Sequence, residues 1–146
     1  MKNILVAINF DNLGQEVIQK ASQIAEKFDS KLWLVHVASE FATLTGNKAA
    51  SQTIRDSRAK ILRAEHQQIQ TYAKALQDKG INATALLIKG DAVDEIIAKA
   101  KSIQADMLVL GAEEYGKIFQ LLFKTVWEDV IKASNVPVLI VPHKGY

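Results

Sequence analysis

Few residues of this 146-residue chain are of a type that performs chemistry, and they are scattered along it. The sequence contains no cysteine, which excludes thiol catalysis, disulfides and thiolate metal sites. Its three histidines, His36, His66 and His143, lack the H-x-x-x-H spacing of a metal site, and no G-x-S-x-G nucleophile motif occurs. We therefore interpret each histidine as structural, either buried or on the surface.

Adjacent acidic residues occur at positions 94–95, 113–114 and 128–129. The first and last pairs fit helix starts, where the helix dipole favours negative charge whatever the function. The middle pair has no histidine support, so it does not predict a metal site. The sequence also lacks the G-x-G-x-x-G and G-x-x-x-x-G-K-[ST] motifs of dinucleotide-binding and P-loop proteins. These observations together predict a protein that is not an enzyme.

The elements that would position these residues follow from the hydrophobic pattern. Apolar, β-branched runs predict strands at residues 4–8, 32–37, 82–88, 107–110 and 136–141, and helical spacing of apolar residues predicts four helices between them. One of these is a long helix within residues 47–79, which Gly80 is placed to cap. Asp11 or Asn12, and then Asp91, are expected to cap the helices that follow them. Alternating apolar strands and amphipathic helices predict an α/β three-layer sandwich around a parallel sheet, in a single domain over residues 1–146.

Ligands of open parallel sheets bind beyond the carboxyl ends of the strands, where the strand order reverses. The segments to inspect are therefore residues 9–12, 37–40, 89–91 and 111–125.

Several segments occur in the order seen in universal stress proteins. They are ILVAI at residues 4–8, LVHV at 34–37, Gly90-Asp91, ADMLVLG at 105–111 and NVPVLIV at 135–141. The chain resembles this family from Lys2 to Pro142. The resemblance implies a flavodoxin-like (adenine nucleotide alpha hydrolase-like) fold with a five-stranded parallel sheet of order 3-2-1-4-5. It also implies a dimeric, cytoplasmic protein of the stress response.

ATP-binding members of the family carry the motif G-x-x-G, nine residues, then G-[ST]. In this chain Gly111 matches the first glycine and Thr125 the last hydroxyl residue, but Glu114 and Lys124 replace the other two glycines. Asn9 stands where those members have an aspartate that contacts the nucleotide. Because glycines let backbone N–H groups approach phosphate closely, these departures predict an eroded ATP site.

Two features leave the alternative of a retained nucleotide site open. Lys124 could supply an ammonium group to a phosphate, and Gly116 could form a rearranged loop. The candidate nucleotide-binding residues are Ala7, Asn9, Val37, Gly90, Leu110, Gly111, Glu114, Gly116, Lys124, Thr125 and Val126. No cofactor is required, but ATP or AMP with Mg²⁺ is the ligand that the resemblance allows.

Thr125 also has a purely structural interpretation. The run Thr125-Val126-Trp127-Glu128 matches a capping box, in which threonine and glutamate satisfy donors at a helix start. We therefore predict capping as the main role of Thr125 and packing as the role of Trp127.

Composition narrows the range of partners. The net charge of +2 does not indicate nucleic-acid binding, and no apolar run approaches the roughly 20 residues that span a membrane. Residues 48–79 hold all three arginines and are basic, which predicts a solvated helix face, with an acidic partner as the alternative. The apolar last strand is expected at a sheet edge, so a homodimer is predicted to pair through Val138, Leu139, Ile140 and Val141.

Two functions are therefore carried forward. The first is a universal stress-type protein that acts as a non-catalytic binding or regulatory module with an eroded ATP site. The alternative is an adenine-nucleotide-binding universal stress protein with a remodelled phosphate loop.

Overall fold

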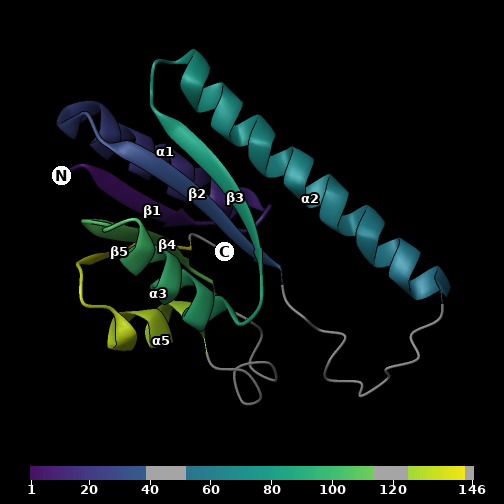
Figure 1. The fold of residues 1–146 in the computed structure, drawn as a ribbon. Coiled ribbons are helices and arrows are strands. Elements are labelled where there is room, and N and C mark those ends of the chain that lie inside the picture. Colours follow the sequence, from purple (N-terminus) through teal and green to yellow (C-terminus); the bar gives the residue numbers. More distant parts are fainter. Residues whose placement is uncertain (39–51, 114–124, 144–146) are drawn as a thin grey trace.

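The computed structural model describes residues 1–38, 52–113 and 125–143. These residues form a parallel five-stranded sheet of order β3-β2-β1-β4-β5, with helices on both faces (Figure 1). The elements along the chain are β1 (Asn3–Ala7), α1 (Asn12–Phe28), β2 (Lys31–Ala38), α2 (Gln52–Asp78), β3 (Ala83–Lys89), α3 (Ala92–Ser102), β4 (Met107–Ala112), α5 (Val126–Ala133) and β5 (Val138–Pro142). The predicted strand order and the flavodoxin-like α/β class are confirmed.

The two faces of the sheet carry separate hydrophobic clusters, because successive strand side chains point to opposite sides. Val6 and Leu34 pack with α1 and α2 on one face. Leu5 and Val35 pack with α3 and α5 on the other face. All four side chains are fully buried, which explains the uninterrupted apolar runs that predicted these strands.

The start of β4 is held beside the start of β1 by one exposed carboxylate. Asp106 accepts hydrogen bonds from the backbone N–H groups of Lys2 at 2.7 Å and Asn3 at 2.9 Å. These two hydrogen bonds lower the pKa of Asp106, because they stabilise the charged form. The contact joins the two neighbouring strands between which the strand order reverses.

Helix ends follow the sequence signals at three places. Asp11 accepts a hydrogen bond from the Gly14 N–H at 2.7 Å, and Asp91 accepts one from the Asp94 N–H at 3.0 Å. Gly80 follows α2 with a φ of +85°, a conformation that suits glycine. These three predicted caps are confirmed. The part of the predicted long helix before Gln52 lies outside the described residues.

Helix α2 extends beyond the sheet at the carboxyl ends of the strands (Figure 1). Its buried residues, Ile69, Ala73 and Leu76, all lie in its C-terminal half. In the N-terminal half Ile54 is 47% exposed and Ile61 is 57% exposed. In the part of the chain that the structure describes, no helix combines the length and the apolar character needed to cross a membrane.

Candidate functional site

A cavity of about 790 Å³ lies at the carboxyl ends of the strands, where β1 and β4 part. This is the point where the strand order reverses, the position at which parallel α/β sheets bind ligands. The residues that line it come from all of the strands β1 to β4 and from the helices α2, α3 and α5. Its polar or charged lining residues among those described are Asn9, His36, Arg58, Glu65, Lys89, Glu113 and Trp127.

The structure brings most of the described candidate nucleotide-binding residues to this cavity. The lining includes Ala7, Asn9, Val37, Leu110, Gly111 and Val126. Gly90 and Thr125 are not in the lining, but each adjoins a lining residue, Lys89 and Val126 respectively. Glu114, Gly116 and Lys124 lie outside the described residues. Contact of any of these residues with a nucleotide stays a prediction.

Asn9 and Glu113 meet across the switch point. Asn9 follows β1, Glu113 follows β4, and the Asn9 side-chain amide donates a hydrogen bond to Glu113 Oε1 over 104 residues of sequence. The Asn9 backbone lies close against the start of α1, because a Cβ atom on Gly14 would collide with the Asn9 carbonyl group. Sequence reasoning identified Asn9 as a candidate but not its partner.

Glycine is favoured for different structural reasons at Gly111, which lines the cavity, and at Gly90, which adjoins it. A Cβ atom on Gly111 would lie 2.7 Å from the Leu13 side chain of α1, so packing requires glycine there without any ligand. Gly90 has a φ of +143°, a conformation that side-chain-bearing residues rarely adopt. Its position after β3 lets the chain turn directly into α3.

The predicted capping box at Thr125 is wrong. Thr125 is the N-cap residue of α5, but its side chain makes no capping hydrogen bond. The Thr125 hydroxyl oxygen is instead buried without a hydrogen-bond partner. The Thr125 backbone carbonyl does accept a bond from the Asp129 N–H at 3.3 Å, so the helix begins where expected without the side chain.

Trp127 packs against the cluster beneath α3 and α5, in agreement with the packing role predicted for it. It also lines the cavity, and its indole Nε1 is buried without a hydrogen-bond partner. Because buried polar groups are normally paired, Trp127 and Thr125 present two unused hydrogen-bonding groups at the start of α5.

His36 and Glu65 form a pair on the α2 side of the cavity. His36 Nδ1 lies 2.8 Å from the Ile8 carbonyl oxygen, which can only accept, so Nδ1 carries the hydrogen. His36 Nε2 lies 3.4 Å from Glu65 Oε2, and the Phe10 ring packs on the imidazole with centroids 4.5 Å apart. His36 is 9% exposed and is therefore buried, while the structural role predicted for it stays a prediction. Sequence reasoning missed Glu65 as a site residue, although it lies within the apolar stripe of α2.

Charged side chains of both signs line the cavity. Arg58 and Glu65 come from α2, Lys89 lies at the end of β3, and Glu113 follows β4. The described residues contain no group of three or more His, Asp or Glu side chains that could hold a metal ion. The cavity lining combines hydrogen-bonding and charged side chains with apolar ones.

Comparison with known proteins connects this geometry to a family. The model of the universal stress protein family matches residues 1–142. This chain belongs to that family. The universal stress protein MJ0577 of Methanocaldococcus jannaschii is 24% identical over 99% of this chain and 96% of its own length.

Solved structures show that the fold is shared with other universal stress proteins. The structure of MJ0577 matches with a TM-score of 0.80 at 22% identity, over 99% of this chain and 98% of that one. A universal stress protein in complex with cAMP matches at 0.71 and 20% identity, over 97% and 96% of the two chains. One from Archaeoglobus fulgidus in complex with dAMP matches at 0.66 and 18% identity, over 96% and 97%.

Proposed function

We propose that this universal stress protein is a non-catalytic binding or regulatory module whose cavity takes an adenine nucleotide and whose ATP site is eroded. The cavity has the volume of a small-molecule site and lies where the fold binds ligands. The cAMP and dAMP bound by two structural neighbours are adenine nucleotides with one phosphate. Asn9 bonds to Glu113 and His36 bonds to the Ile8 carbonyl group, so these polar side chains already have structural partners. This engagement supports a non-catalytic role. A cytoplasmic location stays a prediction.

The observation that carries the proposal is the unused hydroxyl group of Thr125. It lies at the N-terminus of α5, where free backbone N–H groups and the helix dipole favour a phosphate. A buried hydroxyl without a partner is costly, so a ligand oxygen at this place would satisfy it. A single phosphate is sufficient for that contact.

The same hydroxyl also supports a second candidate, the binding of ATP or AMP with Mg²⁺ through a remodelled loop. Thr125 matches the last position of the motif that ATP-binding members of the family carry. The loop residues that would distinguish the two candidates, Glu114, Gly116 and Lys124, lie outside the described residues. A direct comparison of AMP with Mg-ATP therefore separates them.

The test combines mass spectrometry of ligand released from the purified protein with thermal unfolding in AMP or Mg-ATP. A ligand at 100 times its dissociation constant adds about 2.7 kcal/mol, or roughly 5 to 10 °C at this chain length. We expect a saturable shift with AMP, a small one with millimolar Mg-ATP, and no conversion of ATP to ADP. A strong Mg-ATP shift would favour the second candidate. Absence of both a shift and a co-purified adenine compound would contradict the proposal.

A further inference from the structure

Three side-chain atoms of the described residues are buried without a hydrogen-bond partner, and all three belong to residues at the cavity. They are Glu65 Oε2, Thr125 Oγ1 and Trp127 Nε1. Glu65 and Trp127 line the cavity, and Thr125 precedes the lining residue Val126. Buried polar atoms are normally hydrogen-bonded, so each of these atoms calls for an explanation. Because an ionised carboxylate only accepts and an indole N–H only donates, a ligand that satisfied them would need a donor at Glu65 and an acceptor at Trp127.

The acceptor at Glu65 is not satisfied by its neighbour His36. His36 Nε2 lies 3.4 Å from Glu65 Oε2, but the ring hydrogen is on Nδ1, which donates it to the Ile8 carbonyl oxygen. In such a neutral ring Nε2 is itself an acceptor, so it has no hydrogen to give to the carboxylate. The Glu65 side chain is 25% exposed, and the terminal torsion of glutamate turns over a broad range. A ligand in the cavity can therefore reach this carboxylate.

Apolar side chains accompany Glu65 on the same face of α2. Ile61 and Leu62 lie four and three residues before Glu65, a spacing that brings side chains together on a helix, and both line the cavity. Ile61 is exposed even though it is a large aliphatic side chain. The α2 side of the cavity therefore combines apolar surface with a carboxylate, which suits the flat face and the polar edge of a nucleobase.

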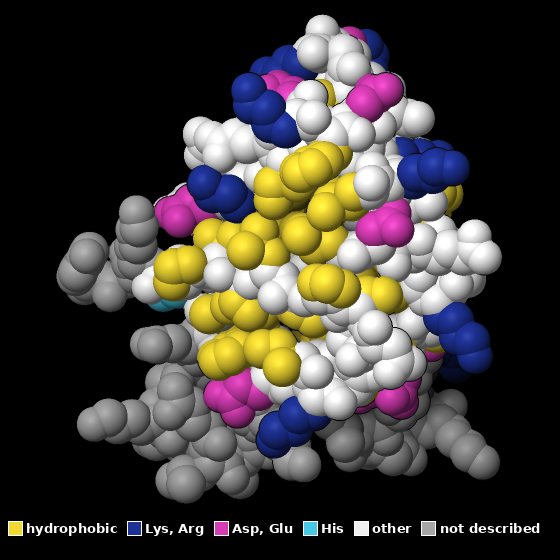
Figure 2. Space-filling model, turned by 90° about the vertical axis from the view of Figure 1, so that its left-hand side faces the viewer, with side chains coloured by type: hydrophobic (Ala, Val, Ile, Leu, Met, Phe, Trp, Pro, Cys, Tyr) yellow, Lys and Arg dark blue, Asp and Glu magenta, His cyan; other side chains and the backbone are white. Residues whose placement is uncertain are grey.

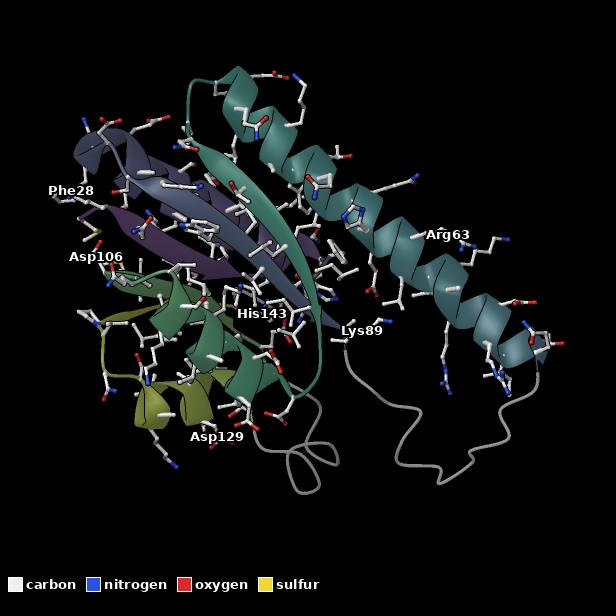
Figure 3. All side chains as sticks on the ribbon, viewed as in Figure 1. Phe28, Arg63, Lys89, Asp106, Asp129 and His143 are labelled. Atoms are coloured by element: carbon white, nitrogen blue, oxygen red, sulfur yellow. The ribbon has the colours of Figure 1, made fainter. Side chains whose placement is uncertain are left out.

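The start of α5 and Glu65 lie on opposite sides of the sheet. Helix α2 packs with α1 on one face, and α5 packs with α3 on the other. Figure 3 shows Arg63 on α2 and Asp129 on α5 on opposite sides of Lys89, at the end of β3. A nucleotide with its phosphate at the start of α5 would direct its base across the strand ends toward α2. The ribose hydroxyl groups are close to the phosphate, whereas the 6-amino group of adenine is the donor farthest from it.

We propose that Glu65 selects the base by accepting a hydrogen bond from the 6-amino group of an adenine nucleotide whose phosphate lies at the start of α5. This inference rests on the proposed function and names the residue that recognises the adenine ring. A purine with an oxygen at position 6 presents an acceptor to Glu65 instead of a donor. Such a base leaves the carboxylate unsatisfied, and a site built around a hydrogen bond rejects the analogue that lacks it.

The test is calorimetric titration of AMP and of purine riboside 5′-monophosphate, which is AMP without the amino group. We expect the wild type to bind AMP at least about tenfold more tightly, because hydrogen bonds to a charged group are among the stronger ones. In Glu65→Met, which keeps an unbranched side chain but removes the acceptor, the two dissociation constants should become nearly equal. The matched control is Glu26→Met, the same change at the exposed C-terminal end of α1, which should leave their ratio unchanged.

Two further nucleotides identify the donor that Glu65 meets. GMP has an oxygen at position 6 and donors elsewhere on its base, and we expect the wild type to bind it at least about tenfold more weakly than AMP. 2′-Deoxy-AMP lacks a ribose hydroxyl group but keeps the amino group. Glu65→Met should therefore weaken the binding of 2′-deoxy-AMP by the same factor as the binding of AMP.

The outcomes separate this proposal from the function on which it rests. Equal binding of AMP and purine riboside monophosphate by the wild type would overturn the role of Glu65 while leaving nucleotide binding intact, and it needs no variant. This is also the result expected if His36 carries a second hydrogen and already donates it to Glu65. Tighter binding of GMP than of AMP, or 2′-deoxy-AMP binding that Glu65→Met leaves unchanged, would place a different donor at Glu65 and overturn the amino-group contact. Failure of all four nucleotides to bind would instead contradict the proposed function, and the base selection with it.

Discussion

At the scale of single residues, the Thr125 hydroxyl distinguishes a structural role from a ligand-binding role. Its oxygen is buried without a partner and makes no capping bond, so replacing it with a methyl group in Thr125→Val removes no hydrogen bond of the unliganded protein. We expect the free energy of unfolding to change by less than about 0.5 kcal/mol, whereas loss of a working cap costs about 1 kcal/mol. The AMP-dependent thermal shift should decrease.

The control for this prediction is Asp91→Ala. The Asp91 side chain does cap α3, by accepting the Asp94 N–H at 3.0 Å, so its loss should cost about 1 kcal/mol in urea unfolding. If Thr125→Val loses as much stability as Asp91→Ala, the capping interpretation is correct after all.

At the scale of elements, α2 divides into a packed half and an overhanging half. Ile69 is fully buried against the sheet, whereas Ile61 is 57% exposed where the helix extends past the strands. We expect Ile69→Ala to lower the free energy of unfolding by about 2 to 5 kcal/mol, because it leaves a cavity in the core. Ile61→Ala, the matched control on the same helix, should change it by about 0.5 kcal/mol or less. Equal losses in urea unfolding would show that the overhanging half is packed as firmly as the rest.

The overhanging half also carries the three arginines of the basic segment 48–79. Arg55, Arg58 and Arg63 lie on α2, and Arg58 lines the cavity. An acidic partner for this segment stays a prediction, as does the alternative that it is a solvated helix face.

At the scale of the whole molecule, the open edge of β5 leads to our prediction of a homodimer. Strand β5 pairs with β4 alone among the described strands, and Val138–Val141 are only partly buried. Figure 2 looks at the side of the molecule where β5 lies in Figure 1, and hydrophobic side chains gather there. An apolar strand edge of this kind favours pairing with a second copy about a two-fold axis.

Amide hydrogen exchange tests the dimer at individual residues. The Pro137 carbonyl accepts the Leu108 N–H at 2.9 Å, so strand alternation directs the Leu139 N–H toward β4 and the Val138 and Ile140 N–H groups outward. We expect the amides of Val138 and Ile140 to be protected at micromolar concentration and to lose protection on dilution. The Leu139 amide is the internal control and should be protected throughout. Fast exchange of Val138 and Ile140 at every concentration, with the sedimentation mass of one chain, would exclude this dimer.

Most of the fold could be predicted because its signals are local. Strand periodicity, the caps at Asp11 and Asp91 and the turn at Gly80 each depend on a few neighbouring residues. The segments that resemble universal stress proteins then supplied the strand order, which local patterns do not contain. The predicted family, the strand order 3-2-1-4-5 and these caps are confirmed.

The amino-acid sequence by itself thus determined the elements, the family and the end of the sheet where the cavity lies. Only the tertiary structure decided how the groups at that end are used. The Asn9–Glu113 bond joins residues 104 positions apart, and Gly111 is required by the Leu13 side chain of a different element. Whether Thr125 caps α5 depended on the orientation of its side chain within the packed protein, because a capping-box pattern states which groups can bond and not which of them do.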